Sequence, residues 1–312
     1  MQKVCKVPVS TVWRSIDKAR DIDSDATDYP ANIQKWLLKL NLEQKLSFCD
    51  DSRIDTQLLY GEPLEVIEEI DEWCKVVCVA QASESDSRGY PGFIPKSHIG
   101  EIEVTDNIQY ARVIVPKTLS YKEDMPFYVL SFNTTLPINH IEDDYVYINS
   151  PDGQLKLKKE AVAIQQHSIP EQNPSFRELY RAASMYIDLG YLWGGMSSYG
   201  YDCSGFVYHM YRHVGFTLPR DAHEQYLATK AIDKQDLIPG DLVYFSNAKD
   251  IDKISHIGIY IGSGFMIHSP NTPNAIEERT IESGLYSDIY VGASRVYDFI
   301  NDGKYKPRSW NA

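Results

Sequence analysis

Two stretches in the first half of the sequence align with each other without gaps. LEVIEEIDEWCKVVC, at residues 64–78, matches LPINHIEDDYVYINS, at residues 136–150, and IPKSHI at 94–99 is echoed by LKKEAV at 157–162. In both copies apolar and polar residues alternate between turn-forming segments, a pattern typical of short β-strands. This repeat constrains the fold strongly, because it predicts two copies of one small β-barrel.

A helical insertion interrupts the first copy. After Pro30, four apolar residues recur at the spacing of an amphipathic helix, namely Ile33, Trp36, Leu37 and Leu40. We therefore predict a helix near residues 31–47.

The second half of the sequence is organised differently. A polar connection, IPEQNPS at residues 169–175, precedes a helical pattern that runs to Gly190. Further helices and then three strand-like segments follow, DLVYFS, HIGIYIG and FMIHS, in an order typical of an α+β domain. The predicted fold class is therefore multidomain, with two small all-β barrels at residues 1–106 and 107–168 and an α+β domain at residues 169–312.

The charge and the cysteines limit the classes of function. The 31 Lys and Arg residues against 44 Asp and Glu residues give a net charge of −13, which argues against nucleic acid or an anionic membrane as the main partner. The five cysteines include no CxxC pair, so a reducing compartment is favoured. Since no segment has the pattern of a signal peptide or a membrane span, we expect a cytoplasmic location. A secreted or cell-surface location is the alternative if a leader has been removed.

One cysteine lies at the predicted start of a helix, in the segment YDCSGFVYHM at residues 201–210. The apolar face of this helix consists of Val207, Met210, Tyr211 and Val214, which places Cys203 in the first turn. There the positive end of the helix dipole and the free N–H groups favour a thiolate, so we expect a lowered thiol pKa and a nucleophilic Cys203. The same N–H groups can stabilise the oxyanion of an acyl intermediate.

Two histidines lie on predicted strands joined by the short turn GSG. Pairing Ile261 with Phe265 across this turn puts His268 opposite Gly258. His256 and His268 then become diagonal neighbours on one face of the sheet. A cysteine at a helix start that packs over this face would complete a Cys-His-His row for nucleophilic catalysis.

Simpler interpretations exist for these residues. A lone cysteine and two histidines can be structural, and the same three side chains could instead ligate a metal ion. His209 and His213 lie four residues apart on the cysteine helix, and we expect them on its solvent-exposed face. The combination of a helix-start thiol with hairpin-paired histidines favours catalysis over these alternatives.

The motifs of the second half resemble the NlpC family of papain-like bacterial cell-wall peptidases. The resemblance covers residues 175 to about 300 and rests on YLWGGMSSYGYDCSGFV, LPRD, DLIPGDLVYFS and HIGIYIGSGFMIHSP. It implies a papain-like catalytic domain with Cys203 as nucleophile, His256 as general base and acid, and His268 as the residue that orients the base. It also implies an oxyanion hole formed by Tyr191 and the backbone N–H of Cys203, and no metal or other cofactor.

The first half resembles the bacterial SH3-like barrels that accompany this domain. TQLLYGEPLEVIEE and RGYPGFIPKSHI are most similar to the γ-D-glutamyl-L-diamino acid endopeptidases. The resemblance implies a murein peptide substrate whose free N-terminal ammonium group is bound by Asp202, Glu62 and Tyr90, with Ser204 as a further substrate-binding residue. For Glu62 and Tyr90, an exposed turn acid and a barrel-packing aromatic residue are the alternatives. Ala222 follows LPRD where many family members have serine or threonine, which removes one possible substrate hydrogen bond.

The resemblance thus predicts a cysteine endopeptidase of cell-wall peptide recycling. It would cleave the bond between D-glutamate and the diamino acid, lysine or diaminopimelate, in peptides with a free N-terminal L-Ala. We expect a monomer with no nucleic-acid partner and no membrane span. Two other functions are compatible with the same fold, a general murein hydrolase or amidase that acts on intact peptidoglycan and an inactive peptide-binding module.

Overall fold

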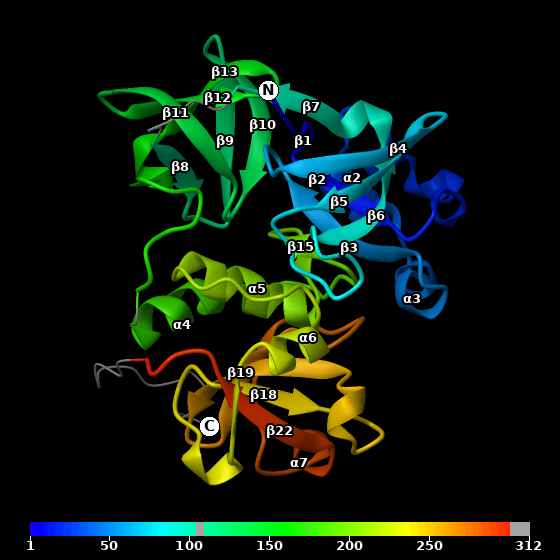
Figure 1. Ribbon diagram of the computed structural model, residues 1–312, viewed down its shortest axis with the longest axis vertical. Coiled ribbons are helices and arrows are strands. Elements are labelled where there is room, and N and C mark those ends of the chain that lie inside the picture. The colour runs from blue at the N-terminus through cyan, green and yellow to red at the C-terminus, as the bar shows by residue number, and fades with distance from the viewer. Residues whose placement is uncertain (104–108, 174, 300–312) are drawn as a thin grey trace. The chain divides into compact units, whose positions relative to one another are not determined.

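The computed structural model describes residues 1–103, 109–173 and 175–299, and the chain divides into two compact units (Figure 1). The first unit comprises residues 1–170 and 193–200, and the second comprises residues 171–192 and the chain from residue 201 onward. Strands dominate the first unit, whereas the second combines helices with an antiparallel sheet. The predicted fold class, β-barrels followed by an α+β domain, is confirmed. The predicted boundary between residues 106 and 107 lies outside the described residues.

A five-stranded sheet in the order β3-β2-β6-β5-β4 forms the first barrel, and β1 pairs with β7 beside it. Alternate side chains of these strands, among them Val12, Leu58 and Val76, fill a buried apolar interior. The strands are β1 (Gln2–Cys5), β2 (Val9–Trp13), β3 (Ile54–Leu59), β4 (Leu64–Ile70), β5 (Trp73–Cys78), β6 (Tyr90–Pro95) and β7 (Ile99–Ile102).

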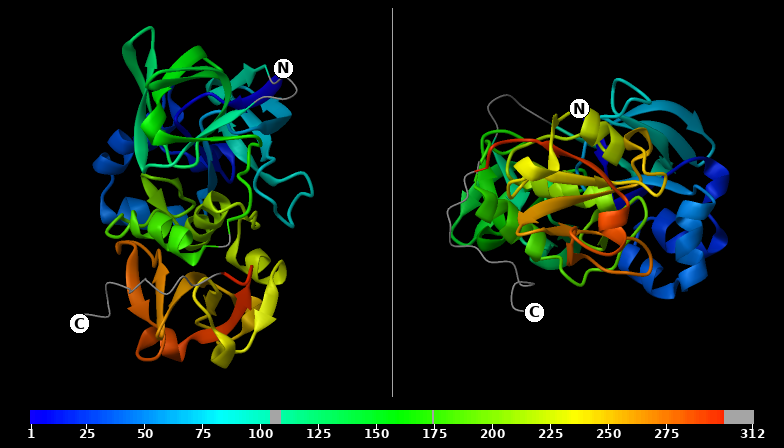
Figure 2. Two further views of the ribbon diagram at one scale, coloured as in Figure 1. Left: turned by 90° about the vertical axis from the view of Figure 1, so that its left-hand side faces the viewer. Right: turned by 90° about the horizontal axis from the view of Figure 1, so that it is seen from below.

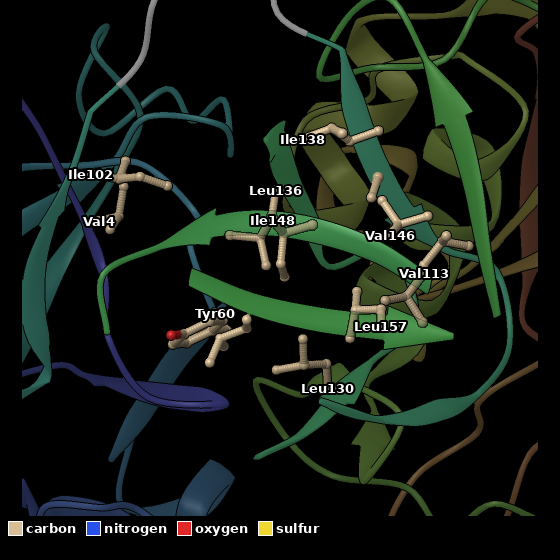
Figure 3. Packing of buried hydrophobic residues seen from close by; sticks show 13 residues of the cluster. Val4, Tyr60, Ile102, Val113, Leu130, Leu136, Ile138, Val146, Ile148 and Leu157 are labelled. Carbon is tan, nitrogen blue, oxygen red and sulfur yellow. The ribbon is translucent and has the colours of Figure 1, made fainter. Parts of the chain in front are cut away.

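A seven-stranded sheet in the order β10-β9-β13-β12-β11-β8-β14 forms the second barrel. Val146, Ile148 and Leu157 point into its interior (Figure 3). Tyr60, the residue after β3 of the first barrel, belongs to the same apolar cluster. The buried Tyr60 hydroxyl donates to Asp152 Oδ2 at 2.8 Å, so its polar end is satisfied. The strands are β8 (Tyr110–Val113), β9 (Lys117–Lys122), β10 (Met125–Ser131), β11 (Thr135–Glu142), β12 (Tyr145–Ser150), β13 (Gly153–Lys158) and β14 (Val162–Gln165).

The sequence repeat corresponds to two equivalent hairpins, β4–β5 and β11–β12. Their registers shift at aligned positions, directly after Val66 in β4 and after Ile138 in β11. Both turn at aligned aspartates with positive φ, 50° at Asp71 and 30° at Asp143. Aligned 3-10 helices follow each hairpin, η3 (Lys96–His98) and η4 (Lys159–Ala161). The repeat is therefore confirmed, including its irregularities.

The segment predicted as one helix near residues 31–47 is helical, but it forms two helices, α2 (Ile33–Lys39) and α3 (Leu42–Asp50), and a shorter helix, α1 (Ser24–Thr27), precedes them. The chain breaks after α2, and Asn41 starts α3 with a reciprocal cap in which the side chains of Asn41 and Gln44 each accept from the other's backbone N–H at 2.9 Å. Trp36 of α2 and Phe48 of α3 pack ring against ring with centroids 5.1 Å apart.

The second unit contains a six-stranded antiparallel sheet in the order β17-β22-β18-β19-β20-β21. Helices α4 and α5 pack against each other, and α5 lies against β19 on one side of the sheet (Figure 1, Figure 2). The helices are α4 (Phe176–Ser184), α5 (Cys203–His213), α6 (Ala222–Leu227) and α7 (Leu285–Asp288). The strands of this sheet are β17 (Lys230–Ile232), β18 (Leu242–Phe245), β19 (His256–Gly262), β20 (Phe265–His268), β21 (Glu277–Thr280) and β22 (Tyr290–Arg295). Two short strands precede α5 in the chain, β15 (Met196–Ser197), which belongs to the first unit, and β16 (Gly200–Tyr201).

Helix α4 ends earlier than the sequence pattern predicts. The pattern continues to Gly190, yet the helix ends at Ser184, and Asp188 adopts a left-handed conformation with φ 73°. The segment after the helix is held by backbone hydrogen bonds, from Asp188 N–H to the Ile276 carbonyl and from Tyr191 N–H to the Asn274 carbonyl, each 2.9 Å long. These tertiary bonds override the helical propensity of the segment and fix the backbone at Tyr191.

No helix in the described part of the chain is long and apolar enough to span a membrane.

Candidate active site

Cys203 is the first residue of α5, as the sequence predicts. Asp202 is the N-cap residue, and its Oδ1 atom accepts a hydrogen bond of 2.7 Å from the backbone N–H of Gly205. This bond satisfies one of the free N–H groups that every helix start exposes. The cap therefore fixes where the helix begins and with it the position of the thiol.

The Asp202 carboxylate is also part of a buried ion pair. Arg220 donates from Nη2 to Asp202 Oδ2 at 2.6 Å and from Nη1 to Asp202 Oδ1 at 3.2 Å, and a further bond of 2.9 Å joins Nη1 to Ser204 Oγ. The Arg220 side chain is only 1% exposed. The charge of Asp202 is therefore already balanced by Arg220, and the Ser204 hydroxyl already has a hydrogen-bond partner.

His256 and His268 are joined by a hydrogen bond between His256 Nε2 and His268 Nδ1 at 2.8 Å. Both rings are buried. Gly258 makes the approach possible, because a Cβ atom at this position would lie 3.1 Å from the Cβ of His268 and 2.6 Å from Met266 Sδ. The predicted pairing of the two histidines on one hairpin is confirmed.

The details of the hairpin turn differ from the prediction. Ile259 pairs with Ile267 as expected, but a register shift follows, so that Gly262 pairs with Phe265 in place of Ile261. The cause is the turn itself, in which three successive residues, Gly262, Ser263 and Gly264, have positive φ. The bulge lies at the far end of the ladder from the histidines and leaves their pairing unchanged.

The prediction of a lowered thiol pKa at Cys203 is also wrong. We expected the helix terminus to lower it, but burial raises the pKa of Cys203 to about 12, and the nearby Asp202 carboxylate acts in the same direction. Arg220 and the backbone N–H groups of Ser204 and Ile257 oppose this effect without overcoming it. Burial also moves the His256 pKa well below its usual value near 6.5, with a contribution from the charge of His268. At neutral pH the Cys203 thiol and the His256 imidazole are therefore both expected to be uncharged.

This protonation state predicts how Cys203 reacts with an alkylating agent. Since the thiolate is the reactive form, the iodoacetamide rate should rise about tenfold per pH unit between pH 6 and 8. The rate at Cys203 is read by peptide mapping, in a Cys49→Ala background that removes an exposed thiol. A rate that is already maximal and constant near pH 5 would show a preformed thiolate–imidazolium pair and contradict the account.

The structure gives the position of each remaining predicted site residue in the fold. Tyr191 belongs to the second unit and lies between α4 and α5 in the chain. Glu62 and Tyr90 belong to the first unit, where Glu62 Oε2 accepts from the Leu59 N–H at 2.9 Å and Tyr90 is the first residue of β6. Ala222 is the first residue of α6. The substrate-binding and oxyanion roles of these residues stay predictions.

His209 and His213 are not on an exposed face. They are 2% and 9% exposed, because α5 is covered on all sides from Ser204 to its end. His209 packs against the ring of Tyr201, with centroids 5.5 Å apart. Among the described residues, no group of three or more His, Cys, Asp or Glu side chains is arranged to hold a metal ion.

Arg220 and Tyr286 are among the contributors to the site that sequence reasoning missed. Arg220 lies in the LPRD motif, and a lone arginine followed by a helix is a weak signal. Tyr286 is in α7, and its ring centroid lies 4.8 Å from that of His268 and 5.7 Å from that of His256. No periodicity could place this tyrosine, because α7 has a single turn and reaches the histidines only through the tertiary fold.

A thiol at a helix start and a hydrogen-bonded imidazole pair on an antiparallel sheet have the fold and chemistry of a papain-like cysteine peptidase. Residues 189–295 match the NlpC/P60 family, and residues 49–99 match the bacterial dipeptidyl-peptidase Sh3 domain. The Gamma-D-glutamyl-L-lysine dipeptidyl-peptidase of Bacillus subtilis (strain 168) is 31% identical over 291 residues, which cover 93% of this chain and 97% of that protein. The chain belongs to the NlpC/P60 family of cysteine peptidases.

Two further similarities extend over nearly the whole chain. A Gamma-D-glutamyl-L-lysine dipeptidyl-peptidase from Bacillus cereus (strain ATCC 10987 / NRS 248) is 31% identical over 299 residues, covering 93% of this chain and 89% of that protein. The crystal structure of an NlpC/P60 family protein from Bacillus cereus ATCC 10987 has a TM-score of 0.89 at 28% identity and covers 95% of this chain and 99% of that one. The resemblance inferred from the motifs is confirmed.

Proposed function

We propose that this chain is a cysteine endopeptidase that cleaves the γ-D-glutamyl bond to a diamino acid in murein peptides with a free N-terminal L-Ala. The observation that carries the proposal is the hydrogen bond of 2.8 Å between His256 and His268, in the unit whose cysteine starts a helix. Two relatives similar over nearly their whole length are named as peptidases of the γ-D-glutamyl-L-lysine bond, which supports the same bond here. Recycling of cell-wall peptides is the proposed role.

The reaction would begin with proton transfer from the Cys203 thiol to His256. Because His256 Nε2 is engaged by His268, the proton is accepted by Nδ1, the other ring nitrogen. The sulfur then attacks the γ-carbonyl carbon of D-glutamate. The tetrahedral oxyanion is stabilised by the Cys203 backbone N–H and by Tyr191, as the resemblance implies.

Collapse of the tetrahedral intermediate would break the bond to the diamino acid. His256, now protonated, gives its proton to the leaving amine and so returns to the neutral form that burial favours. Water, deprotonated by His256, hydrolyses the thioester and releases the L-Ala-D-Glu dipeptide with free Cys203. The steps use only groups of one chain and water, and a monomer is sufficient for them.

For recognition of the free ammonium group we propose the residues that the resemblance assigns to it, Asp202 with Glu62 and Tyr90. Asp202 is paired with Arg220, so its net attraction for a second cation is reduced.

A mass-spectrometric assay on defined peptides tests the proposed function. L-Ala-γ-D-Glu-L-Lys, its diaminopimelate analogue and the N-acetylated form of each are incubated with the enzyme, and the Cys203→Ala variant serves as control. We expect release of L-Ala-D-Glu from the free-amine peptides, with kcat/KM at least about tenfold above that of the acetylated forms. Equal cleavage of acetylated peptides, or cleavage of whole sacculi at a similar rate, would instead indicate a general murein hydrolase. No cleavage by an enzyme with reactive Cys203 would refute the proposed substrate.

A further inference from the structure

The histidine pair has a third neighbour on the next strand, Glu277. It is the first residue of β21 and pairs directly with His268 on β20. Its Oε1 atom lies 3.7 Å from His268 Nε2. His268 is fully buried, and within the described residues its Nε2 atom has no partner at hydrogen-bond length. The row of side chains therefore continues from His256 through His268 to a carboxylate.

Arg279 holds this carboxylate in place. It lies two residues along the same strand and donates from Nε to Glu277 Oε1 at 3.0 Å and from Nη2 to Glu277 Oε2 at 2.9 Å. Such a two-point contact fixes both the position and the plane of the carboxylate. The interaction of Glu277 with the His268 ring, followed by this contact with Arg279, lowers the pKa of Glu277, so the group stays ionised at neutral pH.

The hydrogen bond between the two histidines restricts which ring nitrogen of each can carry the proton. To accept the thiol proton, His256 must have a free lone pair on Nδ1, so its single ring proton lies on Nε2. His256 Nε2–H then donates to His268 Nδ1, which must be unprotonated. A neutral His268 consequently carries its proton on Nε2, the atom that faces Glu277.

We propose that Glu277 is a positioning residue that keeps His268 in this tautomer, and through it leaves the Nδ1 atom of His256 free to take the proton of Cys203. The proposal rests on the proposed roles of Cys203, His256 and His268. Without the carboxylate, His268 could carry its proton on Nδ1. That N–H would face the Nε2–H of His256 at 2.8 Å, and the hydrogen bond between the two rings would be lost. Glu277 does not touch the reacting atoms, so it acts only through His268.

The tautomer also depends on the other groups around His268. These are His256 on β19, Glu277 and Arg279 on β21, and Tyr286 on α7. Burial lowers the pKa of His268, the carboxylate of Glu277 raises it and Arg279 lowers it. Removing the Glu277 charge therefore lowers the pKa of the imidazole pair further, which gives a signed prediction for the pH profile.

Two variants of Glu277 test the proposal in the full-length enzyme. Glu277→Gln keeps an oxygen acceptor and removes the charge, whereas Glu277→Ala removes both. We expect kcat for the γ-D-glutamyl peptide to fall about 10- to 100-fold in Glu277→Ala, less in Glu277→Gln, with KM changed less than about twofold. The acidic limb of kcat/KM should move to lower pH in both variants. The matched control is Glu278→Gln, the same change at the next residue, whose side chain bonds to Tyr180 instead.

Nitrogen-15 spectra of histidine-labelled protein report the tautomer directly. In the wild-type enzyme, His268 should show a protonated Nε2 and an unprotonated Nδ1, and Glu277→Ala should shift this population while Glu278→Gln does not. A structural role alone would leave the tautomer and the pH profile unchanged. Unaltered kcat, pH profile and tautomer in both Glu277 variants would overturn the proposal. Failure of the proposed function would look different, because the wild-type enzyme would then not cleave the γ-D-glutamyl peptide, or the Cys203→Ala variant would cleave it equally well.

Discussion

Replacing Cys203 with alanine is expected to abolish turnover and leave the protein folded. The thiol is the only nucleophile that the protein supplies in the proposed mechanism, and loss of a covalent nucleophile lowers kcat by about four orders of magnitude or more. Alanine is well tolerated in the first turn of a helix, and the Asp202 cap is made by another side chain. The stability of the variant should therefore remain close to that of the wild type.

The measurement is kcat/KM on L-Ala-γ-D-Glu-L-Lys together with urea unfolding of the same preparations. Cys49→Ala is the matched control, because it removes an exposed thiol in α3 and should keep full activity. Substantial turnover in a folded Cys203→Ala enzyme would contradict the mechanism. Loss of both activity and folding would be resolved by Cys203→Ser, which keeps the size of the side chain and should be folded and inactive.

The largest effect on stability is expected for Arg220→Met. The substitution keeps the length of the side chain but leaves the Asp202 carboxylate, 10% exposed, without its cation. Breaking a buried pair from one side costs about 3–5 kcal/mol of the free energy of unfolding, because the remaining charge is uncompensated. The same loss should loosen the start of α5, since Asp202 also caps that helix.

Urea unfolding of three variants measures this effect. Arg181→Met is the matched control, since Arg181 pairs with Glu178 at the surface and should change the free energy of unfolding by less than about 1 kcal/mol. The double variant Asp202→Asn, Arg220→Met should recover most of the loss, because asparagine still caps the helix without a charge. If Arg220→Met were as stable as Arg181→Met, the ion pair would contribute little and this description of the helix start would be wrong.

The sequence was most informative where local periodicity determines the structure. The paired hairpins of the two barrels and the pairing of His256 with His268 depend on alternation with a period of two residues, which shows directly in the sequence. The extent of α5 could be predicted because its apolar residues recur at helical spacing and Gly215, with φ 87°, follows its last turn.

The predictions failed where the outcome depends on tertiary surroundings. The thiol pKa was expected to be low from the helix terminus alone, but burial outweighs the dipole at Cys203. His209 and His213 were placed on an exposed face because α5 has one strongly apolar side, yet neighbouring elements cover the other side too. Glu277 and Tyr286 come from separate elements late in the chain, so only the folded sheet brings them to His268.

The measurement that tests the central claim most directly is the identification of the covalent intermediate. The enzyme is mixed with L-Ala-γ-D-Glu-L-Lys, quenched in acid within milliseconds to seconds, and analysed by intact mass and peptide mapping. The account predicts an L-Ala-γ-D-glutamyl thioester on the peptide that contains Cys203, formed before the dipeptide is released and absent from the Cys203→Ser variant. Peptide cleavage with no acyl group on Cys203 at any quench time, or an acyl group on another residue, would contradict it.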